Sequence, residues 1–404
     1  MRRILVPLAI LGLLFGFVQP ARAQSPALEW KDVGVGYAFG EKITLSVRII
    51  SAAPVQSASV LYQLDGDQNT QTSDLAVAAD GTATFVYPVQ NDLVRPFSRF
   101  YFWFRAVLES GEFIDSPHYS FLYADNRFPW QTIDGVGLRI HWVAGDASFG
   151  QSALNAARAG YQAIQTLIPV PDGDPIDIYI YDSAAEVQAT LTQADASWMA
   201  GHASPDLGVV MVSIAPGETQ SIEMERQIPH ELAHVLLYRL TGSAYASLPT
   251  WLVEGISSQA EQYPNADYTQ VLTTAAGNKS LLPITDLCAP FPNDASGAIL
   301  AYAESSSFTR YLHETYGSSG LQSLIKAFSD GLTCEQGAAR AFGLPLSQLD
   351  LKWRQGSLSE KVSGVAFQNL LPYLAFLGLM LIIPAWQFKA NRQKKESQDG
   401  KKSQ

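Results

Sequence analysis

Alternating hydrophobic and polar positions dominate the first part of the chain. Residues 43–49, 59–64 and 83–87 combine β-branched and aromatic side chains with an approximate period of two, which is typical of half-buried strands. Turn sequences such as Asp80-Gly81 separate these segments. Short strands at this spacing predict a β-sandwich over residues 24–128.

The hydrophobic pattern changes after residue 128. A strand at 138–143, an alanine-rich helix at 149–167 and a strand at 176–181 follow one another, as in mixed α/β folds. From about residue 263 the pattern becomes helical. We therefore predict an α+β lobe over residues 129–262 and a helical lobe over residues 263–362.

One predicted helix carries two histidines four residues apart. The sequence His-Glu-Leu-Ala-His at 230–234 lies among apolar residues compatible with a buried helix, and Thr241-Gly242 supplies its end. Pro229 either starts this helix or kinks it. Positions i and i+4 lie on one helix face, so His230 and His234 can offer two imidazole nitrogens to one metal ion. The alternative is a core helix with two histidines whose hydrogen bonds are made within the protein and which bind no metal.

A catalytic zinc ion takes three protein ligands and leaves a fourth position for water. Glu254, twenty residues after His234, is the expected third ligand, and Glu261 is the next acidic residue along the chain. Glu231 lies beside the histidine pair and is not needed as a ligand, so it can serve as a general base. The sequence thus predicts one zinc ion per chain, held by His230, His234 and Glu254.

These residues resemble the gluzincin class of zinc peptidases, which includes thermolysin and the large aminopeptidases. That class places His-Glu-x-x-His on one helix and a glutamate on the next. Leu-Pro-Thr-Trp-Leu-Val-Glu-Gly at 248–255 is similar to the peptidase MA-like group of secreted or membrane-anchored bacterial proteins. The resemblance covers roughly residues 135–360. It departs from thermolysin at Ser258, where thermolysin has an aspartate that orients a zinc histidine.

The resemblance implies hydrolysis of a peptide or protein substrate. It also implies that a tyrosine or histidine of the helical lobe stabilises the oxyanion, with Tyr302 as the candidate and His313 as the second choice. Residues 209–213 occupy the place of the edge strand that pairs with substrate, and His202 lies near them. The Gly-x-Met-Glu-Asn stretch of the aminopeptidases is not found upstream of His230, which favours an endopeptidase.

Both ends of the chain carry segments typical of export and anchoring. Residues 1–23 combine two early arginines, an apolar stretch and Ala-Arg-Ala, as signal peptides do. Residues 366–388 carry no charge and have roughly the length that spans a bilayer, so they are the predicted transmembrane helix. The tail at 389–404 has six basic residues against two acidic ones, which predicts a cytoplasmic tail and an extracytoplasmic ectodomain. An uncleaved N-terminal anchor and a buried C-terminal helix are the alternatives.

Charge and cysteine content add two expectations. The formal net charge is −11, and both ends are basic, so the ectodomain between them is more acidic still. An acidic ectodomain argues against nucleic acid as a partner. Cys288 and Cys334 lie in the exported part, where we expect one disulfide bond, with two buried free thiols as the alternative.

Together these patterns predict a multidomain protein. An N-terminal β-sandwich, which resembles immunoglobulin-like and fibronectin type III modules, precedes a zincin-like metallopeptidase domain and one C-terminal transmembrane helix. The predicted function is that of a membrane-anchored, extracytoplasmic zinc endopeptidase. Two alternatives remain open: a surface binding or adhesion protein with a structural zinc ion, and a degenerate peptidase-like domain that binds without cutting.

Overall fold

The computed structural model describes residues 28–66, 68–89, 94–191 and 201–358. The chain divides into two compact units, residues 1–127 and residues 128–404. The predicted signal peptide, transmembrane helix and basic tail lie outside the described residues. Within the described part of the chain, no helix has both the length and the apolar character needed to cross a bilayer.

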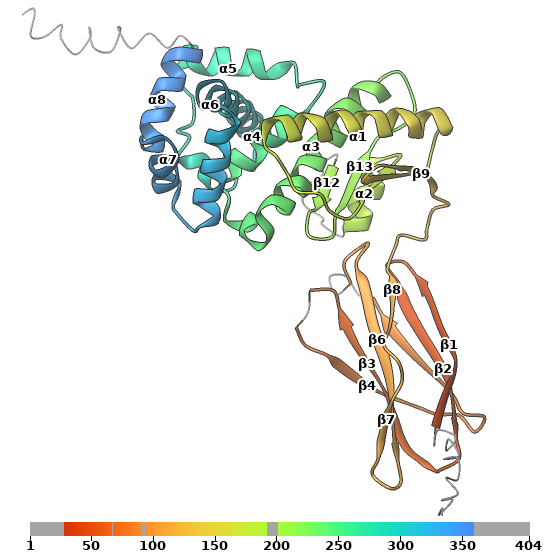
Figure 1. The fold of residues 1–404 in the computed structure, drawn as a ribbon. Helices are drawn as coiled ribbons and strands as arrows, with labels where there is room; N and C mark the ends of the chain where they lie inside the picture. The colour runs from red at the N-terminus through yellow and green to blue at the C-terminus, as the bar shows by residue number, and fades with distance from the viewer. Residues whose placement is uncertain (1–27, 67, 90–93, 192–200, 359–404) are drawn as a thin grey trace, which may run out of the picture. The chain divides into compact units, whose positions relative to one another are not determined.

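The first unit consists of two antiparallel sheets (Figure 1). One sheet has the order β1-β2-β5, and the other has the order β4-β3-β6-β7 with β8 also paired to β6. The strands are β1 (Leu28–Ala38), β2 (Lys42–Ser51), β3 (Val55–Leu64), β4 (Gln71–Leu75), β5 (Thr82–Pro88), β6 (Arg99–Leu108), β7 (Phe113–Asp115) and β8 (Tyr119–Leu122).

Side chains that alternate along these strands fill one core. In β6, Phe100, Phe102 and Phe104 are buried, while Tyr101 between them faces out, because successive strand residues point to opposite faces. Buried residues of both sheets join this cluster. The unit is therefore a β-rich sandwich, consistent with the sequence; its immunoglobulin-like or fibronectin-like class stays a prediction.

The second unit begins with a five-stranded mixed sheet of order β12-β13-β11-β10-β9. Its strands are β9 (Gln131–Gly135), β10 (Leu138–Trp142), β11 (Ile176–Tyr181), β12 (Gly201–Ser204) and β13 (Val209–Ser213). The three central strands are parallel, whereas β9 and β12 are antiparallel to their neighbours.

The prediction that residues 209–213 form the edge strand is wrong. β13 lies between β11 and β12, and β12 is the edge strand of the sheet that the described residues form, with His202 opposite Met211. The run Val-Val-Met-Val is buried on both faces of the sheet, which is typical of an interior strand.

Helices cover the sheet and then form the rest of the unit (Figure 1). They are α1 (Ala147–Leu167), α2 (Ala184–Leu191), α3 (Gln220–Thr241), η1 (Gly242–Ser247), α4 (Thr250–Ala260), α5 (Asp267–Asn278), η2 (Asp286–Cys288), α6 (Ala295–Ser329), α7 (Cys334–Phe342) and α8 (Leu346–Ser357). α6 is interrupted at Gly317, whose φ is 69°. One hydrophobic core runs from the sheet through α1 and α3 to α8.

Helix α3 runs through Pro229 rather than starting there. It begins at Gln220 and ends at Thr241, with Gly242 at its C-terminus. α1 packs closely on it at the proline, since a Cβ atom on Gly160 would lie only 2.6 Å from the Cβ of Pro229. This close contact fixes the position of α3 relative to α1 immediately before His230.

The structure joins Cys288 and Cys334 in a disulfide bond, with a Cα–Cα distance of 6.4 Å. This confirms the expected pairing. The bond connects η2, in the loop that follows α5, to the first residue of α7. It thereby ties a loop of the helical region to the helices that follow α6.

Candidate metal centre and active site

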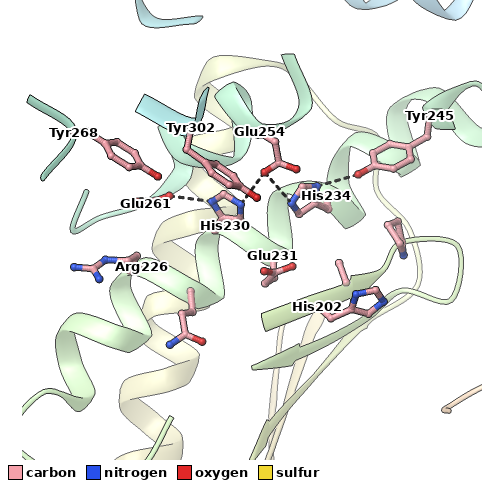
Figure 2. Close-up of a pocket in the computed structure, with 13 residues that line it drawn as sticks. His202, Arg226, His230, Glu231, His234, Tyr245, Glu254, Glu261, Tyr268 and Tyr302 are labelled. Carbon is pink, nitrogen blue, oxygen red and sulfur yellow. Dashed lines mark hydrogen bonds and ion pairs between the residues drawn. The ribbon is translucent and has the colours of Figure 1, made fainter. Parts of the chain in front are cut away.

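Two consecutive helices bring the predicted metal ligands together. α3 presents His230 and His234 on one face, with ring centroids 5.3 Å apart, and α4 presents Glu254 opposite them (Figure 2). Oε2 of Glu254 lies 3.2 Å from Nε2 of His230 and 3.9 Å from Nε2 of His234. One possible ligand atom from each residue lies within 4.8 Å of the others.

The geometry of this group fits a zinc ion. Zinc bonds to histidine nitrogen and carboxylate oxygen are roughly 2.0–2.2 Å long, so two ligand atoms at a tetrahedral angle are about 3.3 Å apart. The 3.2 Å separation matches that value, and the 3.9 Å separation is somewhat longer. Two imidazoles and one carboxylate are also a common donor set of catalytic zinc.

Each histidine has a partner on its far nitrogen. Nδ1 of His230 lies 2.9 Å from Oε1 of Glu261, and Nδ1 of His234 lies 2.9 Å from the hydroxyl of Tyr245 (Figure 2). Such partners orient an imidazole and favour the tautomer with its proton on Nδ1, which leaves the Nε2 lone pair for a metal. Glu261 is thus placed as an orienting residue rather than as a third ligand.

The sequence did not identify either orienting residue. Ser258, at the position of the thermolysin aspartate, is buried, and the carboxylate comes from Glu261, three residues later and just beyond the end of α4. Tyr245 lies in η1, between the two helices, and belongs to no motif. The only signal for Glu261 was that it is the next acidic residue after Glu254.

Pro229 explains how Glu261 reaches His230. A proline has no N–H, so the carbonyl of Glu225 loses its usual partner within the helix. That carbonyl instead accepts a hydrogen bond from the N–H of Gln262, at 2.8 Å. The bond holds the chain after α4 against α3, with Glu261 next to the ring of His230.

Glu231 lies between the histidine pair and β12 (Figure 2). Burial raises the pKa of its carboxyl to about 7. The nearby carboxylates of Glu254 and Glu261 also raise this pKa, whereas His230 lowers it. A carboxyl group with a pKa near neutrality can both accept and release a proton. This position and pKa suit a general base.

Burial and neighbouring charges also shift the pKa values of the three candidate metal ligands. Burial lowers the pKa of His234 to about 4, so its imidazole is neutral, as metal binding requires. Burial opposes the ionisation of Glu254, but His234 and His230 outweigh it and lower the pKa of this carboxyl. Burial likewise disfavours charge on His230, yet Glu254 and Glu261 hold its pKa well above the usual value.

These residues line a cavity of about 440 Å³. Tyr302 of α6 contributes to its wall, with a ring centroid 6.3 Å from that of His230, and His202 contributes from β12. Burial raises the pKa of Tyr302, so its hydroxyl remains protonated. His313 does not line the cavity formed by the described residues; its Nε2 lies 3.3 Å from the hydroxyl of Ser318.

A model of the Peptidase MA superfamily matches residues 156–358, which is half of the chain. The chain therefore belongs to the Peptidase MA superfamily. No curated protein matches it.

Several solved structures resemble parts of the chain. A family 56 carbohydrate-binding module, a β-1,3-glucan binding domain, is 14% identical over 23% of this chain and 98% of its own, with a TM-score of 0.18. OgpA from Akkermansia muciniphila is 18% identical over 26% of this chain and 31% of its own, with a TM-score of 0.19. A polysaccharide deacetylase from Bacillus cereus is 8% identical over 49% and 65%, with a TM-score of 0.20. The likenesses are too distant to carry an argument about this chain.

Proposed function

We propose that the protein is a zinc-dependent endopeptidase, anchored in the membrane with its catalytic domain on the extracytoplasmic side. Membership of the Peptidase MA superfamily supports peptide hydrolysis. The observation that carries the proposal is the meeting of His230, His234 and Glu254 in one cavity with Glu231 beside them. The apolar segments at 1–23 and 366–388 support export and anchoring.

In this proposal His230, His234 and Glu254 hold the ion. Zinc in such a site supplies Lewis acidity, which polarises a peptide carbonyl and makes a water molecule more acidic. Glu231 accepts the proton of the attacking water and delivers it to the amine that leaves. Tyr302 donates its hydroxyl hydrogen to the oxygen of the scissile carbonyl as negative charge develops there.

The edge strand β12 supports binding of an extended peptide. It is the edge strand of the sheet that the described residues form, and extended peptides can bind beside a strand in that position. His202 and Ala203 of this strand line the same cavity as Glu231. The absence of the aminopeptidase stretch upstream of His230 supports internal cleavage.

The substitution Glu231→Gln tests this function. We expect the variant to retain about one zinc ion per chain, because Glu231 is not a ligand, and to lose at least about a hundredfold in peptide cleavage, because an amide cannot accept the proton of water. Zinc is measured by atomic absorption, and cleavage by mass spectrometry of a peptide mixture.

Glu254→Ala is the companion variant. It should lose most of the zinc, because two protein ligands rarely hold the ion. Equal cleavage rates for wild type and Glu231→Gln would reject the hydrolase. Bound zinc without any cleavage by wild type would instead favour a structural zinc ion or a degenerate domain.

A further inference from the structure

One charged side chain of the cavity, that of Arg226, has no role in the proposed mechanism. Arg226 lies on α3 one helical turn before His230, so the two residues share a helix face. It lines the cavity together with Tyr268 of α5. Figure 2 shows Arg226 and Tyr268 on the same side of the three candidate metal ligands as Glu261, away from His202 and Tyr245.

Within the part of the chain that the structure describes, the guanidinium of Arg226 has no carboxylate partner. Its Nε lies 3.4 Å from the carbonyl oxygen of Tyr263, and its Cζ lies 5.9 Å from the centroid of the Tyr263 ring. Among the described residues, no Asp or Glu forms an ion pair with it, and its two terminal nitrogens make no hydrogen bond. Arg105, Arg127 and Arg354 show the usual alternative, since each forms an ion pair with an aspartate at 2.6–2.7 Å.

The charges around the cavity favour a substrate carboxylate beside Arg226 and disfavour one elsewhere. Glu231, Glu254 and Glu261 line the cavity, and Arg226 is the only lysine or arginine among the described lining residues. A substrate carboxylate next to these glutamates would be repelled. Beside Arg226 it would meet two unused N–H₂ groups, arranged as a planar fork that binds a carboxylate through parallel hydrogen bonds.

We propose that Arg226 is a specificity residue that binds a carboxylate of the substrate close to the scissile bond. This inference rests on the proposed function, because it needs a peptide in the cavity. The carboxylate comes either from an aspartate or glutamate side chain or from the free C-terminus of a peptide. Both sources present the same chemistry to the guanidinium.

The helix geometry sets the distance from the cleaved bond. Arg226 and His230 are four residues apart, which is about 6 Å along a helix axis. An extended peptide advances about 3.3 Å per residue, so the carboxylate belongs within about two residues of the scissile bond. This is a positional expectation that a cleavage profile can contradict.

The first experiment is a cleavage profile of the purified, zinc-loaded full-length chain. The substrate is a random decapeptide library, blocked at both ends, and the cut sites are read by mass spectrometry. We expect Asp and Glu to be enriched at one position within two residues of the cut. In Arg226→Gln this enrichment should disappear, while Arg226→Lys should keep part of it, because lysine retains the charge without the fork.

Matched peptides then separate specificity from a general defect. For an Asp peptide, Arg226→Gln should lower kcat/KM about tenfold or more, mainly through KM, since a hydrogen bond between charged groups contributes that much. For the same peptide with Asn, the change should stay below about twofold. Arg310→Gln, an exposed arginine of α6, removes the same charge away from the cavity and should alter neither value. A second peptide pair, which ends in a free or an amidated C-terminus within two residues of the cut, distinguishes the two carboxylate sources.

Direct binding gives a readout that does not depend on turnover. The Asp and Asn peptides are titrated into zinc-loaded Glu231→Gln, with and without Arg226→Gln, and binding is followed by fluorescence anisotropy. A preference for Asp that Arg226→Gln removes supports the inference, even where no variant cleaves. Equal affinities for the two peptides, or an equal loss for both in Arg226→Gln, would overturn it. Cleavage by wild type without any acidic preference would overturn it too, and would leave the endopeptidase standing.

Discussion

At the residue scale, the centre depends on the two partners that hold its histidines. Glu261 binds Nδ1 of His230 and Tyr245 binds Nδ1 of His234, both at 2.9 Å. The Glu261 side chain is only 4% exposed, so water cannot easily replace it. A negative partner also increases the electron density of the imidazole, which strengthens its bond to a metal.

We therefore predict that Glu261→Gln weakens zinc binding about 10–100-fold, the usual effect of losing such a partner. Tyr245→Phe should act in the same direction with a smaller effect, because it removes a neutral hydroxyl. Zinc affinity is measured by competition with a chromophoric chelator. The control is Glu314→Gln, which neutralises an exposed carboxylate on α6. An unchanged zinc affinity in Glu261→Gln would show that His230 is oriented by other contacts.

The sequence predicted the residues whose relation is fixed by one helix. His230, Glu231 and His234 are positioned by a spacing that any α-helix preserves. Glu254 was predicted because a catalytic zinc ion needs a third protein ligand, and the resemblance agreed with it. The roles of Glu261 and Tyr245 could not be predicted, because their side chains reach the histidines only after η1 and the segment beyond α4 have packed against α3. A spacing along the chain does not encode such a contact.

At the element scale, Pro229 shows why local rules were insufficient. The sequence left open whether the proline starts the helix or kinks it, and α3 begins nine residues earlier, so the proline does not start it. The hydrogen bond that the proline removes is replaced by one from Gln262 to the carbonyl of Glu225. This replacement comes from the segment that follows α4, so it is a tertiary contact. β12 is a second element that depends on a tertiary contact. Its short sequence, Gly-His-Ala-Ser, has no alternating hydrophobic pattern that would predict a strand, and it becomes one by pairing with β13.

The contact of α4 with α6 sets how Glu254 and Tyr302 face each other. Gly255 follows Glu254 and lies against α6, where an added Cβ would be 2.6 Å from the carbonyl oxygen of Ser305 and 3.0 Å from the Cβ of Thr309. Real Cβ atoms do not approach backbone oxygen so closely. The two helices must separate to accept any larger residue at this position.

Gly255→Ala should therefore destabilise the protein by about 1–3 kcal/mol, the usual cost of overpacking. It should also weaken zinc binding, because Glu254 moves with α4. Gly277→Ala is the matched control, since an added Cβ there would have no described atom within 4 Å apart from its chain neighbours and the backbone of its own helix. In a helix that change is expected to be neutral or stabilising by roughly 0.5–1 kcal/mol. Thermal denaturation measures both variants, and a Gly255→Ala protein as stable as wild type would contradict the close contact.

At the scale of the whole molecule, the order of a β-rich unit and a largely helical unit followed from the change in hydrophobic period near residue 128. The chain divides between Arg127 and Phe128. Within the second unit, one hydrophobic core runs from the sheet strands to α8 and so connects the two predicted lobes. A shared core of this kind depends on which faces pack together, and periodicity alone does not specify the partner of each face.

The remaining prediction concerns the attachment of this molecule to a membrane. The uncharged run at 366–388, followed by a basic tail, predicts that the full-length chain sediments with membranes and needs detergent for extraction. A chain that ends at Gly364 should be soluble when exported. The shortened chain should still bind about one zinc ion, because His230, His234 and Glu254 all precede the cut and lie on α3 and α4, whose buried apolar residues belong to a core that extends to α8. Full-length protein in the soluble fraction without detergent would contradict the anchor, whereas loss of zinc on truncation would mean that the C-terminal segment supports the metal centre.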